Sequence, residues 1–175
     1  EMLRDHCNKV GIEFMSSVFN LQGVEWAEKL GMNRYKIASR CIGQQDLFDA
    51  VGETGKDMIV SLGMWKDANP TAPLPTYIKS KGKVDFLYCV AKYPTMPEDV
   101  DFDKIDFKDK YSGFSDHTIG MNAPLIAVAR GARILEKHFT LSKKMHGPDH
   151  QGSMEPNELR QLVKSAREFE EFMSK

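Results

Sequence analysis

The sequence predicts an α/β protein in which parallel strands alternate with helices. Short apolar runs rich in isoleucine, valine and phenylalanine recur along the chain, as expected of strands that are buried on both faces. Helix signals lie between these runs, which is the arrangement of repeated βαβ units. Right-handed crossovers wind such units into either an open sheet or a barrel. The 175 residues fit one domain, so residues 1–175 are expected to form a single domain.

Six apolar runs are the expected strands, and a polar or helical stretch follows each of them. They are residues 13–17, 35–39, 58–61, 84–89, 112–116 and 132–137. Because the closed barrel of this class has eight strands, six strands fall short of closing it. The apolar runs alone therefore leave the open sheet and the barrel as alternatives.

Capping residues indicate where the helices begin and end. The first ten residues space their apolar side chains as a helix does, and Gly11 is expected to end this helix. Asn20 is expected to cap a second helix, which Gly31 ends. Two further helices are expected around residues 47–51 and 125–129.

The clearest helix begins near Pro156, where proline suits the first helical turn. Its apolar residues share one face, as in an amphipathic helix. They are Leu159, Leu162, Val163, Ala166, Phe169 and Phe172. Residues 69–75, by contrast, contain prolines that break a helix, so none is expected there.

Composition excludes several classes of partner. The formal net charge is −1 and the basic residues are scattered, so we expect no nucleic-acid partner and no anionic membrane partner. No apolar run approaches the ~18 residues that span a bilayer, and the first residues do not form a signal peptide. Cys7, Cys41 and Cys89 are too far apart for a metal or disulfide framework. This cysteine usage suits small buried side chains in the reducing cytoplasm.

Polar residues end nearly all of the expected strands, where a buried strand should remain apolar. In parallel α/β architectures these carboxyl ends converge on the active site. The serines at these ends are Ser17, Ser39, Ser61 and Ser115, and Lys36 lies within a strand. Hydroxyls and one cation predict a site for a phosphate or a carboxylate. No glycine-rich phosphate loop is present, so a nucleotide is not indicated.

Two histidines, His117 and His138, end neighbouring strands and are expected on the same rim. Imidazoles combined with oxygen ligands suit Mn²⁺, Fe²⁺ or Zn²⁺ better than Ca²⁺. Nearby carboxylates at Asp116, Glu136 and Asp149 could orient the imidazoles or transfer protons. The alternative at this point is a pair of hydrogen-bonded histidines without a metal.

Seven motifs in a fixed order resemble the N-acetylneuraminate synthase family, which includes the pseudaminic and legionaminic acid synthases. They are YKIAS (35–39), SLGM (61–64), YPTMPEDV (93–100), GFSDHTIG (113–120), EKHFT (136–140), GPDH (147–150) and SMEP (153–156). The motifs cover almost the whole chain, and their order is more specific than any one of them. The resemblance implies an incomplete TIM-type (β/α) barrel of about six parallel units, the C-terminal three-quarters of the synthase barrel.

The resemblance also implies roles for individual residues. His117 and His138 would bind a divalent metal, Mn²⁺ or else Mg²⁺ or Co²⁺. Phosphoenolpyruvate would contact Ser17, Lys36, Ser39, Ser61 and Ser115. The catalytic residues facing the amino sugar would be Tyr93, Glu136 and Asp149. In the implied reaction, C3 of phosphoenolpyruvate attacks the aldehyde of an open-chain N-acylated amino sugar, water adds at C2, and phosphate leaves by C–O cleavage.

Departures from the family pattern leave two alternatives. The family has Ser-Gly-Glu after the lysine strand, whereas this chain has Ser39-Arg40-Cys41, and Ala91 stands where a polar residue is usual. The family's first two strand–helix units have no counterpart in this sequence. We therefore expect a missing N-terminal segment or self-association through open strand edges. We also expect weak or absent synthesis by the chain alone. The alternatives are a non-catalytic sugar- or phosphate-binding remnant and another phosphoenolpyruvate-dependent aldol-type synthase. The paired Ser-Asp-His and Glu-Lys-His motifs argue against the second alternative.

Overall fold

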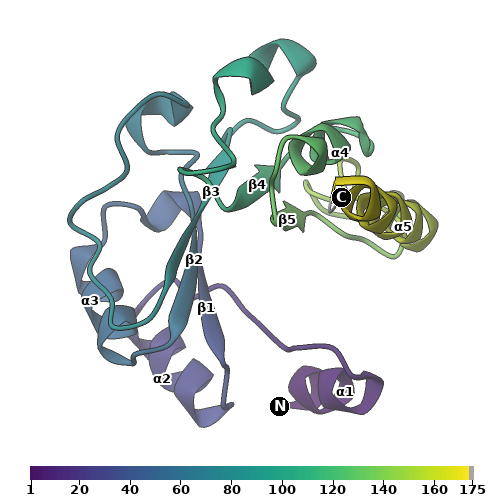
Figure 1. Ribbon diagram of the computed structural model, residues 1–175. Helices are drawn as coiled ribbons and strands as arrows, with labels where there is room; N and C mark the ends of the chain where they lie inside the picture. The colour runs from purple at the N-terminus through teal and green to yellow at the C-terminus, as the bar shows by residue number, and fades with distance from the viewer. Residues whose placement is uncertain (174–175) are drawn as a thin grey trace. The chain divides into compact units, whose positions relative to one another are not determined.

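The computed structural model describes residues 1–173 and has the predicted α/β class (Figure 1). Within these residues, five parallel strands follow one another in chain order. They are β1 (Arg34–Ile37), β2 (Asp57–Ser61), β3 (Val84–Cys89), β4 (Gly113–Asp116) and β5 (Ile134–Lys137). The helices are α1 (Met2–Val10), α2 (Leu21–Lys29), α3 (Gln45–Glu53), α4 (Asn122–Ala129) and α5 (Pro156–Met173). None of the helices in residues 1–173 is both long enough and apolar enough to span a membrane.

The predicted strand at residues 13–17 is reduced to one bridge, so the count of six units is not confirmed. A single parallel bridge joins Ser17 to Lys36, and the amide of Val18 donates to the carbonyl of Lys36 at 3.0 Å. Met15 is 40% exposed and Ser16 is also exposed. Little apolar burial is therefore available to offset the entropy of ordering this run as a strand.

The described chain divides into two compact units. The first contains Glu1–Ser61 and Pro73–Asp85, and the second contains Leu62–Ala72 and Phe86–Lys175. Chain contacts concentrate within these two units, and the expectation of a single domain over residues 1–175 stays a prediction.

In the first unit β1 and β2 pair in register, with Lys36 opposite Ile59. The core of this unit is apolar and includes residues of both strands and of α2 and α3. These are Val24, Ala27, Tyr35, Ile37, Leu47, Phe48, Val51, Met58 and Val60. The predicted cap is present, since the Asn20 side chain accepts a hydrogen bond from the amide of Gly23 at 2.9 Å.

Glu28 on α2 links two other parts of the first unit. Its carboxylate accepts hydrogen bonds from the Tyr35 hydroxyl and from Lys56 Nζ, the latter at 2.7 Å. Partial burial raises the pKa of Glu28, but the hydrogen bonds from Lys56 and Tyr35 outweigh it and hold this pKa below its ordinary value of 4.5. The ionised form of Glu28 is therefore favoured in the folded protein.

We expect Glu28→Gln to reduce the loss of stability in acid. A carboxyl whose pKa is lowered on folding adds stability above its unfolded pKa, and this contribution disappears as the pH falls through the folded pKa. The free energy of unfolding, measured with urea at a series of pH values below about 5, should fall less steeply for the variant than for the unchanged protein. Glu25→Gln, at an exposed position on the same helix, is the control and should keep the original slope.

In the second unit β4 pairs with both β3 and β5. Cys89 lies opposite Ser115, and Ser115 lies opposite Glu136. Helices α4 and α5 lie side by side (Figure 1). Only Leu162 of the predicted apolar face of α5 is fully buried, whereas Phe169 is 38% exposed. The apolar pattern therefore predicted this helix correctly but overstated how much of its face is covered.

The proline-rich segment at residues 69–75 contains no helix, as predicted. The ammonium group of Lys110 holds it by donating to the carbonyl oxygens of Pro70, at 2.6 Å, and Ala72. Since proline removes backbone donors, this side chain supplies hydrogen bonds that a helix would otherwise provide.

Candidate functional site

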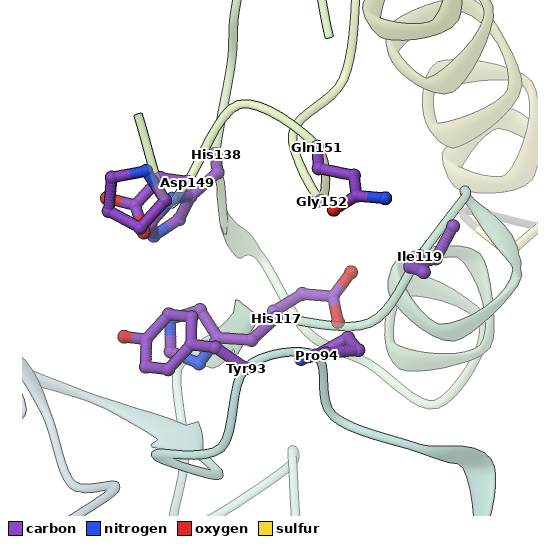
Figure 2. Close-up of a pocket in the computed structure, with 10 residues that line it drawn as sticks. Tyr93, Pro94, His117, Ile119, His138, Asp149, Gln151 and Gly152 are labelled. Atoms are coloured by element: carbon purple, nitrogen blue, oxygen red, sulfur yellow. The ribbon is translucent and has the colours of Figure 1, made fainter. Parts of the chain in front are cut away.

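A pocket of about 350 Å³ lies in the second unit, beyond the carboxyl ends of β4 and β5 (Figure 2). Four segments form it: the residues that follow β3, the residues that end or follow β4, the residue that follows β5, and the loop before α5. Its lining residues are Tyr93, Pro94, Asp116, His117, Ile119, His138, Pro148, Asp149, Gln151 and Gly152. The carboxyl ends of parallel strands are where such folds place their active sites.

His117 and His138 face this pocket together, each just beyond the end of its strand. Their ring centres are 5.4 Å apart and the rings are nearly perpendicular, at 82°. The parallel pairing of β4 with β5 sets this spacing, because it aligns the residue before each histidine, Asp116 with Lys137. The two rings therefore lie close enough to act on one bound group.

The hydrogen bonding of His117 fixes which ring nitrogen is available. Nδ1 lies 2.8 Å from the carbonyl oxygen of Val90, which can only accept, so Nδ1 carries the proton. Burial lowers the pKa of His117, although the Val90 hydrogen bond and the nearby carboxylate of Glu136 act in the opposite direction. A neutral ring protonated at Nδ1 presents the lone pair of Nε2, which is the form that binds a metal ion.

The Tyr93 ring packs against both imidazoles. Its centre is 4.1 Å from that of His117 and 5.7 Å from that of His138. Partial burial raises the pKa of Tyr93, and the negative charges of Asp149 and Glu136 raise it further. The hydroxyl therefore remains protonated and can donate a hydrogen bond near neutral pH.

The two predicted carboxylates occupy different places. Asp149 lines the pocket from the loop before α5. Glu136 is half-buried within β5, opposite Ser115, and is not a lining residue. Its charge nevertheless acts on the pKa of His117 and of Tyr93, so it lies within electrostatic reach of both.

Several hydrogen bonds hold the loop that carries Asp149. The amide of Met154 donates to the carbonyl of His138 at 2.8 Å, and the Thr140 hydroxyl lies 2.7 Å from Nδ1 of His150. The Ser153 hydroxyl donates to the carbonyl of Asp149 at 2.6 Å. These hydrogen bonds hold the pocket wall in place, and His150 stabilises the loop through its contact with Thr140.

Four of the five residues predicted to bind phosphoenolpyruvate belong to the first unit. Lys36 is only 4% exposed, and its Nζ donates to the carbonyl of Ile37 at 3.1 Å. Ser17 forms the bridge to Lys36, whereas Ser39 and Ser61 stand at the carboxyl ends of the paired strands β1 and β2. Ser115, the fifth, is buried in β4 of the second unit.

Sequence reasoning gave no role to several residues at the pocket. Ile119 lies within the GFSDHTIG motif, Gln151 directly follows the GPDH motif, and both line the pocket. Proximity to the Asp-His and Gly-Pro-Asp motifs was the only signal that could have identified them. Lys137 was also given no role, although it forms a buried ion pair with Asp116.

The donor set suits an ion that leaves coordination positions open. Among residues 1–173 no group of three or more histidine, cysteine, aspartate and glutamate side chains is arranged to hold a metal. The two imidazoles could supply two nitrogen ligands, and water or substrate oxygens would complete the shell. Open positions of this kind are what a metal needs in order to act on a substrate.

Comparison with known proteins gives consistent relatives. The NeuB family model matches residues 1–175. The N,N'-diacetyllegionaminic acid synthase of Campylobacter jejuni is 35% identical over 96% of this chain and 52% of its own length. The N-acetylneuraminic acid synthetase of Leptospira borgpetersenii, solved in complex with citrate, has a TM-score of 0.86 and 30% identity over 99% of this chain and 62% of that one. The chain spans about half the length of the curated relatives it matches.

A more distant solved structure shares the fold alone. The phospho-2-dehydro-3-deoxyheptonate aldolase of Thermotoga maritima has a TM-score of 0.74 at 14% identity, over 98% of this chain and 54% of that one.

Proposed function

Because the chain belongs to the NeuB family, we propose that it is part of a sialic-acid-type synthase that condenses phosphoenolpyruvate with an open-chain N-acylated amino sugar and releases phosphate. The observation that carries this proposal is the pocket in which His117, His138, Tyr93 and Asp149 meet. A phosphoenolpyruvate-dependent aldol-type synthase of the heptulosonate kind is less well supported, since that relative shares only the fold.

His117 and His138 would hold a divalent ion, Mn²⁺ or else Mg²⁺ or Co²⁺. When bound, such an ion supplies a Lewis acid that polarises a carbonyl oxygen, here the sugar aldehyde. The fit rests on His117, whose Nδ1 hydrogen bond to Val90 leaves Nε2 free to face the pocket. Backbone carbonyls that accept from the second nitrogen are common partners of metal-binding histidines.

The other residues of the pocket would orient the sugar and transfer protons. Tyr93, with its raised pKa, would donate a hydrogen bond to the sugar without losing its proton. Asp149 on the pocket wall and Glu136 in β5, whose charge acts on Tyr93, are the carboxylates available for proton transfer. The proton of the attacking water would pass to one of these carboxylates as the water adds to C2.

Phosphoenolpyruvate binding is assigned to Lys36 with Ser17, Ser39, Ser61 and Ser115. The buried ammonium of Lys36 provides a positive charge that serine hydroxyls lack. We also place this activity in the cytoplasm, which the free thiols of Cys7, Cys41 and Cys89 support.

The test of the function uses the protein encoded by the intact reading frame, with Mn²⁺, phosphoenolpyruvate and a panel of N-acylated amino sugars. Release of inorganic phosphate together with a nonulosonic acid in the product mixture is the expected result. Binding of Mn²⁺ and phosphoenolpyruvate without turnover of any sugar would favour the non-catalytic alternative.

We expect Lys36→Ala to weaken phosphoenolpyruvate binding more than the change of any single serine to alanine. The lysine change removes a charge as well as a donor, and charge-assisted hydrogen bonds are roughly twice as strong as neutral ones. Titration calorimetry with phosphoenolpyruvate measures the dissociation constants. Lys29→Ala, at an exposed position at the end of α2, is the control. Equal losses for Lys36→Ala and Ser61→Ala would contradict the assignment.

A further inference from the structure

We propose that the buried ion pair between Asp116 and Lys137 is a positioning device that holds the two pocket histidines at their spacing. This inference rests on the proposed function, since it concerns how His117 and His138 are presented to a metal ion. Asp116 is among the residues that line the pocket, but its side chain is 0% exposed. The pair would therefore act through the strand ends that it joins and not by contact with the metal or the substrate.

The pair is short and enclosed. Lys137 Nζ lies 2.5 Å from Oδ2 of Asp116, and the two side chains are 5% and 0% exposed. The other carboxylate oxygen, Oδ1, accepts from the amide of Thr118 at 2.8 Å. Lys137 also donates to the carbonyl of Thr118, so the ammonium contacts both the β4 side chain and the backbone beyond it.

The position of the pair in the sheet connects it to the histidines. Asp116 and Lys137 are the last residues of β4 and β5 and lie directly opposite each other in the register. Each immediately precedes a pocket histidine. Side chains alternate between the faces of a strand, so a slip or rotation of either strand end would carry its imidazole with it.

Two other roles for the pair are less consistent with its contacts. A general base needs an accessible oxygen, but both oxygens of Asp116 are engaged and its charge is compensated by Lys137. Stability alone is also a weak reason for the pair, because apolar replacement of a buried ion pair is often neutral or stabilising. Burying two charges costs free energy of desolvation. A positioning role accounts for the presence of such a pair at this point in the sheet.

The test uses the double variant Asp116→Leu with Lys137→Met, which removes both charges without leaving one unpaired. Titration calorimetry measures Mn²⁺ affinity, and urea unfolding measures stability. We expect the double variant to fold but to bind Mn²⁺ about 10–100-fold more weakly, the loss typical of removing groups that orient metal ligands. Lys104→Met is the control, because it removes the ion pair of Lys104 with Asp101, 2.7 Å long and exposed, and should leave the affinity unchanged.

A second measurement does not require a metal. In the metal-free double variant, the ring NMR signals of His117 and His138 should shift and broaden, while the signal of exposed His6 stays constant. The single variant Lys137→Arg, which keeps the charge, should retain most of the affinity of the unchanged protein.

The outcomes separate this inference from the function on which it rests. If the unchanged protein binds Mn²⁺ and the folded double variant binds it equally well, with unaltered histidine signals, the positioning role is wrong and the metal site stands. If the unchanged protein binds no Mn²⁺, the metal site itself is wrong and the positioning role falls with it.

Discussion

Mn²⁺ binding is expected to be lost when His138 is replaced by alanine, and equally when His117 is replaced. The pocket offers two imidazoles and, within residues 1–173, no third clustered ligand that could compensate for the loss of one. Since even an outer-shell partner is typically worth 10–100-fold in metal affinity, a direct ligand should be worth at least about 100-fold. Titration calorimetry or the electron paramagnetic resonance signal of free Mn²⁺ measures the change.

The control for this prediction is His6→Ala, which alters an exposed histidine on α1. Its affinity for Mn²⁺ should match that of the unchanged protein, with about one ion bound. Undiminished binding by a protein in which both His117 and His138 are alanine would contradict the assignment of the metal to this pocket.

The sequence was a good guide to local structure because its signals are local. Asn20 caps α2, and Gly11 and Gly31 adopt positive φ beyond the helices they end, at 75° and 69°. The strands β1 to β5 lie within or overlap the predicted apolar runs. These features depend on residues a few positions apart, which a sequence pattern records directly.

Features that depend on partners distant in the sequence were predicted less well. The run at residues 13–17 has the composition of a strand, but it makes only one bridge, at Ser17. Asp116 was expected to orient an imidazole or to transfer a proton, and its ion pair with Lys137 of the next strand was not foreseen. The structure makes this cross-strand ion pair visible, because composition alone does not give the register of β4 on β5.

Glu136 is a further residue whose surroundings its motif alone does not give. The family resemblance implies that it faces the sugar, and the structure places it half-buried in β5, outside the pocket lining. What the structure adds is its effect on the pKa of Tyr93 and His117, which places its charge near both.

Among the proposed substitutions, a single methyl group added at Gly113 is expected to cause the largest loss of stability. A Cβ at this position would lie 1.9 Å from the carbonyl oxygen of Ile134 and 2.7 Å from its carbonyl carbon. Both are backbone atoms of the paired strand, so no side-chain rotation can relieve the clash, and β4 must move away from β5. Gly113→Ala should lower the free energy of unfolding by about 3 kcal/mol or more, at or above the upper end of the usual cost of overpacking.

The same displacement should reach the pocket, because the pairing of β4 with β5 sets the spacing of His117 and His138. The folded fraction of Gly113→Ala should therefore bind Mn²⁺ more weakly than the unchanged protein does. Gly43→Ala is the matched control, since a Cβ there meets no atom within 4 Å, and its free energy of unfolding should change by less than about 1 kcal/mol. Urea unfolding followed by circular dichroism compares the two variants. If Gly113→Ala proved as stable as Gly43→Ala, then β4 and β5 would not approach as closely as the structure places them, and the spacing of the histidines would need another explanation.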